Sequence, residues 1–249
     1  MTPQLPVGVD VGGTGVKLAP VDLGRGELAV ERVRVETPRP STPEAIAALI
    51  AEQLDRLDAP GPLGVALPSV VIDGTVRTAA NIDPTWVGTD AVELLERSTR
   101  RAVGVVNDAD AAGLAEMRYG AGRGQAGVVV MVTLGTGIGT GLFVDGLLVP
   151  NSELGHLPMH HGDAEDWAAE SAREREGLSW GAWAHRLTKY LELVEELLSP
   201  RLFILGGGVS KKADKFIPLI ECATPVVPAR LHNDAGIVGA ALFAPGAEA

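Results

Sequence analysis

Cysteine is almost absent from this chain of 249 residues, since Cys222 is its single example. One cysteine cannot form an intrachain disulfide or supply a cysteine-cluster zinc site, and such usage is typical of a reducing cytoplasm. Long hydrophobic runs are also missing: no apolar segment approaches the roughly 18 residues needed to span a bilayer. The first residues lack the basic start and apolar run of a signal peptide. We therefore expect a cytoplasmic protein without a membrane span.

Positive charge is scarce as well, with 21 Lys and Arg against 32 Asp and Glu and a net charge of −11. This balance disfavours nucleic acid or an anionic membrane as a partner of the whole surface. Aromatic residues make up only 4% of the chain, whereas glycine is abundant with 31 residues. The composition predicts an α/β protein with many tight turns, long enough for one large domain or two lobes.

The stretch around which the chain is organised covers residues 103–110. Residues 103–106 include three valines and predict a short buried strand, and residues 109–119 predict a helix. Asn107 and Asp108 lie between them, at the carboxyl end of the strand, where ligands usually bind in open α/β sheets. Both residue types also cap helices, so this motif alone leaves the role of Asp108 open between ligand binding and capping.

The order of the expected elements repeats along the chain, because a strand, a Gly-Thr-Gly turn and a second strand occur at residues 10–21 and again at 133–144. Two related lobes with a cleft between them explain this repetition. We expect one lobe from residues 1–106 with 234–249, and the other from residues 107–233. The remaining patterns predict strands at 28–36, 63–67, 147–149, 201–205 and 225–227, and helices at 42–57, 89–98, 163–176, 179–198, 211–220 and 235–243.

The two glycine turns are candidate phosphate sites. Successive backbone N–H groups in such a turn converge on an anion, and an ordinary hairpin turn needs only one glycine. Thr14 adds a hydroxyl donor, and Asp10 can hold a metal ion through water. Each turn alone is weak evidence, but the pair predicts that a phosphate chain is bound between the lobes. The candidate residues are Asp10, Gly12, Gly13, Thr14, Lys17, Gly135, Thr136 and Gly137.

Two further segments carry candidate ligand contacts. The glycines at 206–208 suit a nucleotide site or a tight strand-to-helix turn equally well. The three lysines that follow can bind a polyanion or form a solvated helix face. The glycines are Gly206, Gly207 and Gly208, and the lysines are Lys211, Lys212 and Lys215.

Residues 151–156 bring together Glu153 and His156, which can accept from and donate to one small polyol. His156 can also be a structural histidine, or a metal ligand with His160 and His161. The absence of cysteine or further histidine at ligand spacing disfavours the metal. Asn81 is equally well explained as a sugar contact or as a turn residue.

These motifs, in this order, resemble the ROK family of sugar kinases in the actin-like ATPase superfamily, over essentially the whole chain. The segments 78–81, 105–113, 150–156 and 233–241 are most similar to its short, zinc-free branch, whose members use polyphosphate. The resemblance implies a duplicated actin-like (ribonuclease H-like) α/β fold. It also implies phosphorylation of the 6-hydroxyl of glucose by polyphosphate and/or ATP, with Mg²⁺ and without zinc. One departure is Ser69, which follows Pro68 where that branch typically has Pro-Gly.

The resemblance also assigns roles residue by residue. Asp108 lies where the family has its general base, Asn107 lies on the sugar-binding motif with Glu153 and His156, and Glu165 matches a further sugar contact. We also expect a homodimer. Three alternatives stay open: a kinase for mannose or N-acetylglucosamine, a sugar-binding protein without activity, and a sugar-responsive transcription regulator. The regulator needs an N-terminal helix-turn-helix, for which the phosphate motif at Asp10 leaves no room.

Overall fold

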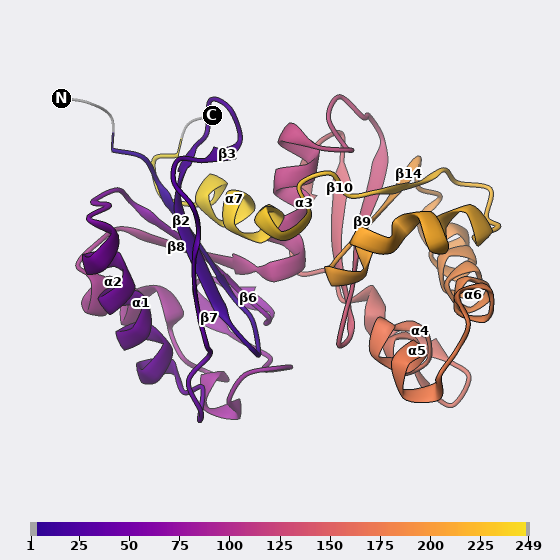
Figure 1. Ribbon diagram of the computed structural model, residues 1–249, viewed down its shortest axis with the longest axis horizontal. Helices are drawn as coiled ribbons and strands as arrows, with labels where there is room; N and C mark the ends of the chain where they lie inside the picture. The colour runs from indigo at the N-terminus through magenta and orange to yellow at the C-terminus, as the bar shows by residue number, and fades with distance from the viewer. Residues whose placement is uncertain (1–3, 248–249) are drawn as a thin grey trace. The chain divides into compact units, whose positions relative to one another are not determined.

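The computed structural model describes residues 4–247, and the chain divides into two compact units (Figure 1). The first unit comprises Met1–Ala115 and Asp234–Ala249, and the second comprises Glu116–Asn233. The expected boundary after residue 106 is therefore misplaced. The first part of helix α3 (Asp108–Tyr119) stays with the first unit, because Ala111 packs there with Ala66, Val106 and Ala240.

The first unit is built on one mixed sheet with the strand order β3-β2-β1-β5-β8, and β4 also pairs with β2. Strands β1 and β2 form an antiparallel hairpin, whereas β1, β5 and β8 run parallel. The strands are β1 (Val7–Val11), β2 (Val16–Asp22), β3 (Glu27–Leu28), β4 (Val33–Val35), β5 (Leu63–Leu67) and β8 (Val103–Asn107). The other elements are α1 (Pro43–Leu57), α2 (Ala91–Thr99), α7 (Ala235–Leu242), the hairpin β6 (Val71–Ile72) and β7 (Thr75–Val76), and η1 (Pro84–Trp86).

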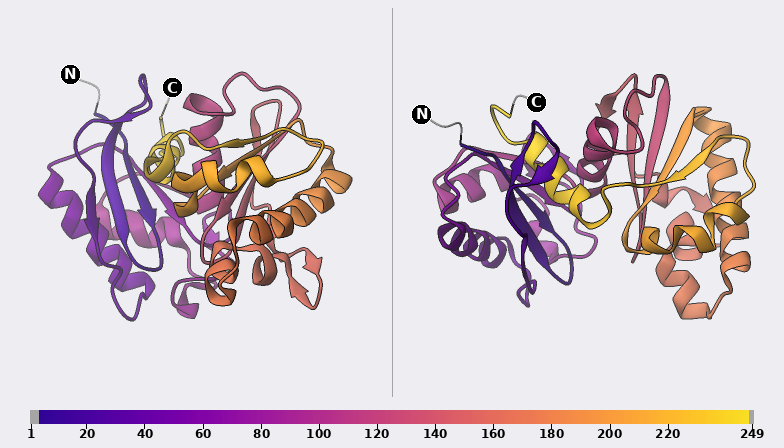
Figure 2. Two further views of the ribbon diagram at one scale, coloured as in Figure 1. Left: turned by 45° about the vertical axis from the view of Figure 1, so that its right-hand side comes forward. Right: turned by 45° about the horizontal axis from the view of Figure 1, so that its top comes forward.

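The two faces of this sheet differ because side chains alternate along each strand. One face presents a row of valines, including Val9, Val65 and Val105, to the core formed with α1 and α2. The opposite face presents a row of glycines at 8, 64 and 104, which are register neighbours on β1, β5 and β8. Helix α7 lies on this glycine row, and its contact with the sheet can be followed in the further views (Figure 2).

The approach of α7 is close enough to require glycine. A Cβ atom at Gly8 would lie 1.8 Å from the carbonyl oxygen of Ile237, and one at Gly64 would lie 1.7 Å from that of Ala240. A Cβ at Gly104 would lie 2.1 Å from the carbonyl oxygen of Phe243. The glycine row therefore holds the backbone of the C-terminal helix directly against three strands.

The expected strand at 28–36 is wrong as a single element. It forms only β3 and β4, because residues 29–32 leave the sheet. Arg32 in this interruption forms an ion pair with Asp234, which directly precedes α7. The interruption therefore coincides with a long-range contact that alternation along the sequence does not predict.

Helix boundaries follow local capping. Thr42 precedes α1, and its Oγ1 accepts a hydrogen bond from Ala45 N at 3.3 Å, with Pro43 at the first helical position. Helix α6 (Trp180–Leu198) begins in the same way, since Ser179 Oγ accepts from Ala182 N at 3.2 Å. These caps explain why both helices start where the sequence predicts.

The second unit repeats the topology of the first. Its sheet has the order β11-β10-β9-β14-β15, with an antiparallel β9–β10 hairpin and parallel β9, β14 and β15. The duplicated α/β fold expected from the two glycine turns is confirmed. The strands are β9 (Val128–Leu134), β10 (Ile138–Val144), β11 (Leu147–Val149), β14 (Leu202–Gly206) and β15 (Val226–Pro228). The smaller elements are η2 (Leu154–His156), β12 (Pro158–Met159), β13 (Gly162–Asp163), α4 (Ala164–Ala168), α5 (Glu170–Glu176), η3 (Gly208–Lys215), η4 (Ile217–Leu219) and η5 (His232–Asp234).

Two expected helices of this unit are wrong in form. The segment 163–176 is two helices, α4 and α5, separated at Ala169, whose ψ of 162° is extended. The segment 211–220 is not α-helical but forms the 3₁₀ turns η3 and η4. Phe216 between these turns is fully buried against Trp183, and Pro218 cannot donate a backbone hydrogen bond. Burial of one aromatic ring thus prevails over helix propensity.

Within residues 4–247, no helix is both long enough and apolar enough to cross a membrane.

The glycine row gives a stability prediction. We expect Gly64→Ala to destabilise the first unit by about 2 kcal/mol or more, because the new methyl group would overlap the backbone of α7. Gly181→Ala in α6 is the matched control: its Cβ would have no described atom within 4 Å, and alanine favours a helix by up to about 1 kcal/mol. Thermal unfolding by circular dichroism compares the two, and equal stability of Gly64→Ala and the unchanged protein would contradict the packing argument.

Candidate functional site

The first glycine turn joins β1 to β2 and forms a closed loop. Its ends are fixed by the register pair Val11–Val16, and Gly12 N donates to Gly15 O at 3.0 Å. Thr37 Oγ1 donates to the Gly12 carbonyl at 2.5 Å, which holds the loop from the side. Thr14, at the tip, is exposed. The loop therefore keeps a fixed shape while its tip stays accessible to a ligand.

Asp10 and Lys17 lie at the base of this loop and pair with each other, with Lys17 Nζ 2.7 Å from Asp10 Oδ2. The Asp10 carboxylate also packs closely on α7, because a Cβ at Gly236 would lie 2.9 Å from Asp10 Cγ. Two predicted phosphate-site residues are thus brought together, and the C-terminal helix fixes one of them. This carboxylate suits a hydrated magnesium ion, which keeps several waters and needs only one or two carboxylates besides phosphate oxygens.

Two other groups contact the loop. The guanidinium of Arg34, which is paired in register with Lys17 across β2 and β4, lies over Gly15, 3.1 Å from where a Cβ would be. Sequence reasoning missed Arg34, since the register of β4 is not visible in the sequence. The carbonyl oxygen of Asn81 lies 3.0 Å from the Cβ position of Gly13. Asn81 thus contacts the first glycine turn through its backbone.

The Asn107–Asp108 pair lies at the end of β8, as predicted, and the open question of capping has a clear answer. The buried Asn107 side chain caps α3, because its Oδ1 accepts from Ala109 N at 2.8 Å and from Asp110 N at 3.1 Å. Asp108 is the first helical residue and is half-buried, and its Oδ1 also lies 2.8 Å from Ala109 N. Asn107 Oδ1 therefore caps the start of α3, and Asp108 Oδ1 shares the Ala109 N–H with it.

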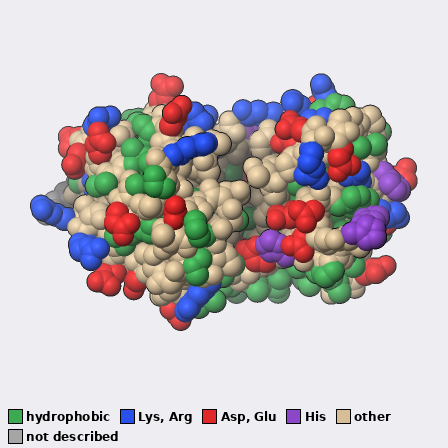
Figure 3. Space-filling view, turned by 90° about the horizontal axis from the view of Figure 1, so that it is seen from below, with side chains coloured by type: hydrophobic (Ala, Val, Ile, Leu, Met, Phe, Trp, Pro, Cys, Tyr) green, Lys and Arg blue, Asp and Glu red, His purple; other side chains and the backbone are tan. Residues whose placement is uncertain are grey.

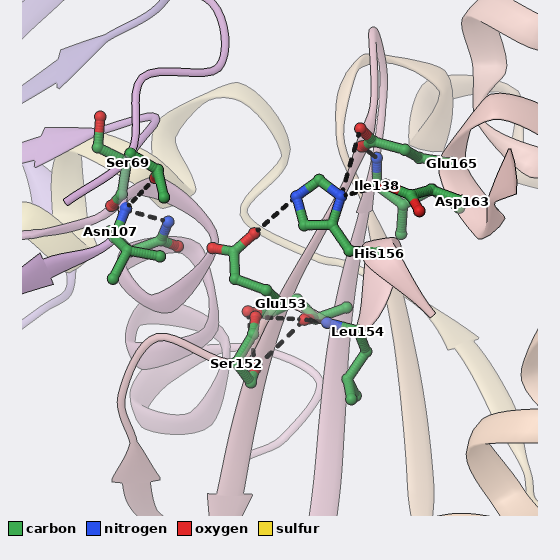
Figure 4. A network of polar contacts seen from close by, with 12 residues as sticks. Ser69, Asn107, Ile138, Ser152, Glu153, Leu154, His156, Asp163 and Glu165 are labelled. Carbon is green, nitrogen blue, oxygen red and sulfur yellow. Dashed lines mark hydrogen bonds and ion pairs between the residues drawn. The ribbon is translucent and has the colours of Figure 1, made fainter. Parts of the chain in front are cut away.

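Ser69 supports the orientation of Asn107. Its carbonyl oxygen accepts a hydrogen bond from Asn107 Nδ2 at 3.2 Å (Figure 4). Ser69 is absent from the described residues with left-handed backbone, so a side chain at this position causes no backbone strain. The serine that replaces the usual glycine thus leaves the contact with Asn107 in place.

In the second unit, the turn of Gly135, Thr136 and Gly137 is held by side chains from α4 and α5. Ser171 Oγ donates to the Thr136 carbonyl at 2.6 Å, and Ser171 N donates to the Gly135 carbonyl at 3.0 Å. Glu165 Oε2 accepts from Ile138 N at 3.0 Å and would lie 2.2 Å from a Cβ at Gly137. Glu165, predicted as a sugar contact, therefore also shapes the second phosphate turn.

Hydrogen bonds hold the segment before η2 against β10. Thr140 Oγ1 donates to the Ser152 carbonyl at 2.6 Å and accepts from Leu154 N at 3.1 Å (Figure 4). A Cβ at Gly155 would lie 2.1 Å from the Ile138 carbonyl oxygen. This packing fixes the backbone that carries Glu153 and His156.

The imidazole of His156 lies between carboxylates on both sides (Figure 4). Its Nε2 is 3.4 Å from Glu153 Oε2, and its Nδ1 is 2.9 Å from Asp163 Oδ2 and 3.9 Å from Glu165 Oε1. The structure therefore brings the three predicted sugar residues Glu153, His156 and Glu165 together. It adds Asp163, which sequence reasoning did not single out.

These neighbours shift the titration of two groups. The hydrogen bond to Asp163 raises the pKa of His156, partial burial opposes it, and the charges of Glu165 and Glu153 raise it further. Partial burial raises the pKa of Glu153, His156 opposes this, and the like charge of Glu165 adds to it. Glu153 as a carboxylate and His156 as an imidazolium form an acceptor and a donor side by side, which suits a polyol.

The sequence left His160 and His161 open as metal ligands together with His156. Among residues 4–247, no group of three or more His, Cys, Asp or Glu side chains is arranged to hold a metal ion. His160 instead packs on Trp167, with ring centroids 4.0 Å apart.

The three glycines after β14 have different roles. A Cβ at Gly206 would lie 2.3 Å from Met131 Cε, and one at Gly207 would lie 2.2 Å from the Leu134 carbonyl oxygen. Gly207 also has a φ of 83°, which disfavours a side chain. These two glycines are explained by packing, whereas a Cβ at Gly208 would have no described atom within 4 Å.

The three lysines of η3 are exposed, and two of them, Lys212 and Lys215, form part of a larger cationic cluster around Trp180. Lys212 Nζ and Lys215 Nζ each lie 5.8 Å from the centroid of this ring, and the Arg173 guanidinium lies 4.2 Å from it. Sequence reasoning missed Arg173 and Trp180, because they come from other segments. On the face drawn in Figure 3, by contrast, basic side chains are interspersed with acidic ones.

Comparison with known proteins identifies relatives over nearly the whole length. The model of the ROK family matches residues 6–172. A polyphosphate glucokinase of Mycobacterium tuberculosis (strain CDC 1551 / Oshkosh) is 50% identical over 236 residues, covering 94% of this chain and 89% of the relative.

Two solved structures are also similar. An inorganic polyphosphate/ATP-glucomannokinase from Arthrobacter sp. strain KM has 51% identity and a TM-score of 0.92, covering 96% of this chain and 97% of that one. A ROK family glucokinase from Streptomyces griseus, in complex with glucose and AMPPNP, has 26% identity and a TM-score of 0.83, covering 96% and 99%.

The paired carboxylate and imidazole predict a bell-shaped pH dependence of glucose binding. Protonation of Glu153 removes an acceptor on the acid side, and deprotonation of His156 removes a donor on the alkaline side. Because both pKa values are raised, both limbs should lie at higher pH than for the ordinary groups. Calorimetry with glucose across pH measures this. Glu153→Gln should flatten the acid limb and His156→Ala the alkaline limb, and unchanged profiles in both would make the segment merely structural.

Proposed function

The chain belongs to the ROK family, and we propose that it transfers a phosphoryl group from polyphosphate or ATP to the 6-hydroxyl of glucose. The observation that carries the reaction type is the Asn107–Asp108 pair at the end of β8, because Asn107 caps α3 and Asp108 places a half-buried carboxylate at the first helical position. The substrates are supported by the names of relatives at about half identity over nearly the full length.

In this proposal, the oxygen of the 6-hydroxyl of glucose attacks the terminal phosphorus of the donor, and Asp108 accepts the proton of that hydroxyl. The bond from that phosphorus to its bridging oxygen breaks, which leaves a shortened polyphosphate or ADP. Phosphoryl transfer needs mainly alignment and charge neutralisation. This proposal assigns the binding of the sugar to Asn107, Glu153 and His156. Glu165 lies on the Nδ1 side of the His156 ring.

The phosphate oxygens are assigned to the two glycine turns, which offer backbone N–H groups, together with Lys17 and Arg34. Magnesium, held through water by Asp10, would supply further positive charge at the transferred group. A cytoplasmic location and a homodimeric state complete the proposal.

Replacement of Asp108 tests the base. We expect Asp108→Asn to lower kcat by about 10²–10⁴-fold and to leave glucose affinity nearly unchanged, because asparagine keeps the shape but cannot take the proton. The readouts are a coupled assay of glucose 6-phosphate formation and calorimetry with glucose.

Asp90→Asn is the matched control, because Asp90 caps α2 through Glu93 N at 2.9 Å and the same substitution there should retain activity. A near-normal kcat of Asp108→Asn would contradict the assignment of Asp108 as the base and leave it with a structural role. Running the assay with mannose and with N-acetylglucosamine tests the alternative acceptors.

The cationic cluster around Trp180 (Arg173, Lys212 and Lys215) and the exposed Lys211 beside it in sequence are assigned to the polyphosphate chain. We expect the double variant Lys211→Glu with Lys215→Glu to increase the KM for polyphosphate by a much larger factor than the KM for ATP. Contacts with a polyanion are largely electrostatic, so the KM for polyphosphate should rise with salt concentration much faster than the KM for glucose. In the double variant, the KM for polyphosphate should rise less steeply with salt than in the unchanged protein.

Lys189→Glu is the control for this pair. Lys189 is exposed and bound to Glu192 at 2.7 Å, outside the cluster, and its replacement should leave both donors unaffected. Rapid turnover with ATP and none with polyphosphate would make the enzyme an ATP glucokinase and overturn the assignment of the cluster.

A further inference from the structure

Asp163 is the carboxylate nearest to His156, and the sequence motifs assign no role to it. Three segments of the second unit place acidic groups around this imidazole: Glu153 before η2, Asp163 at the end of β13, and Glu165 in α4. Only the contact with Asp163, at 2.9 Å, has the length of a normal hydrogen bond, since the other two are 3.4 and 3.9 Å.

We propose that Asp163 is a positioning residue of the sugar site: it accepts the Nδ1–H of His156 and thereby turns Nε2–H toward a sugar hydroxyl bound beside Glu153. This inference rests on the proposed sugar-binding role of His156. Asp163 acts through the imidazole and does not itself contact the sugar.

Asp163 is suited to this role because it is held on both sides. It pairs with Pro158 across the small β12–β13 hairpin and precedes α4, where it forms a reciprocal capping box with Asp166. In this box, Asp163 N donates to Asp166 Oδ2 at 3.3 Å. A carboxylate at a helix start is favoured by the backbone dipoles, so the ring is oriented by an anchored group.

Glu165 cannot replace Asp163 in this role. Its Oε2 already accepts from Ile138 N at 3.0 Å, and its Oε1 is too far from Nδ1 for a hydrogen bond. Glu165 contributes negative charge near the ring, whereas Asp163 contributes the directional bond that fixes which nitrogen faces the sugar.

The remaining side of the ring then has the geometry for a bridging hydroxyl. Nε2 and Glu153 Oε2 are 3.4 Å apart, so a hydroxyl oxygen about 2.8 Å from both can accept from Nε2–H and donate to the carboxylate. Both bonds involve a charged partner and are therefore stronger than neutral ones. Without the bond to Asp163, the ring can rotate or lose this proton.

The titration of His156 gives a readout that does not depend on catalysis. The hydrogen bond to Asp163 is the largest cause that raises the pKa of His156. Asp163→Asn keeps an oxygen that can accept from Nδ1–H but removes the charge, so the imidazolium should lose its proton at lower pH. Imidazole ¹⁵N NMR follows both the pKa and the tautomer, with His156→Ala identifying the signal among the five histidines.

The test compares Asp163→Asn, Asp163→Glu and the control Asp166→Asn, in which the asparagine oxygen can still accept from Asp163 N and only the charge at the neighbouring position is removed. We expect Asp163→Asn to move the His156 titration and the alkaline limb of glucose binding to lower pH together. At the alkaline end of the wild-type range, the glucose dissociation constant should rise by about tenfold. Asp163→Glu should recover much of both effects, and Asp166→Asn should change neither.

An unchanged His156 titration in Asp163→Asn overturns the inference. So does weaker glucose binding with an unchanged titration, which is the result expected of a purely structural residue. If Asp163→Asn does not fold, the titration and tautomer of His156 in Asp163→Glu decide the matter. A wild-type protein that binds no glucose overturns the proposed function. In that case the NMR titration still decides separately whether Asp163 holds the Nδ1 proton.

Discussion

The close contact between α7 and the glycine row of β1, β5 and β8 is the constraint on which the first unit depends. Gly8, Gly64 and Gly104 lie beside one another in register and let three backbone carbonyls of the C-terminal segment approach the sheet directly. Helix α7 follows the whole second unit in the sequence, so the first unit is completed by a segment that comes after the second unit. The same helix start places Asp234 on Arg32 and Gly236 on Asp10, which ties the phosphate loop to the packing of α7.

Much of the fold could be predicted because its signals are local. The strands 63–67 and 147–149 were predicted with their observed bounds, since short apolar runs lie between turn residues. The signals failed where distant contacts decide. In the 211–220 segment Pro218 is a local signal against a helix, but nothing local reveals the burial of Phe216 against Trp183, and the break in the 28–36 strand contains Arg32, whose ion-pair partner Asp234 is distant in sequence. Glycine abundance predicted close backbone approach, but not that the partner at positions 8, 64 and 104 is a helix.

The candidate site divides in the same way. Glu153 and His156 could be predicted together because they are three positions apart in the sequence, and their contact at 3.4 Å agrees with this. Asn107 and Asp108 could be placed at a strand end, but which of them caps the helix needed the distances to Ala109 and Asp110. Arg34 and Asp163 could not be found, because a strand register and a hairpin bring them to their partners.

The charges of the two substrates explain why the proposed sugar and donor sites differ. Glucose carries no charge, so a site that uses ionised groups to bind hydroxyls must balance those charges itself. The imidazolium of His156 offsets part of the negative charge of the carboxylates around it, and His156 and Glu153 are then a donor and an acceptor for a hydroxyl. A phosphate chain brings its own negative charge, and the groups assigned to it are cations and backbone N–H donors: Lys17, Arg34 and the lysines near Trp180. Removing one charge from the sugar site should therefore change its pH dependence, whereas removing one from the donor site should change its salt dependence.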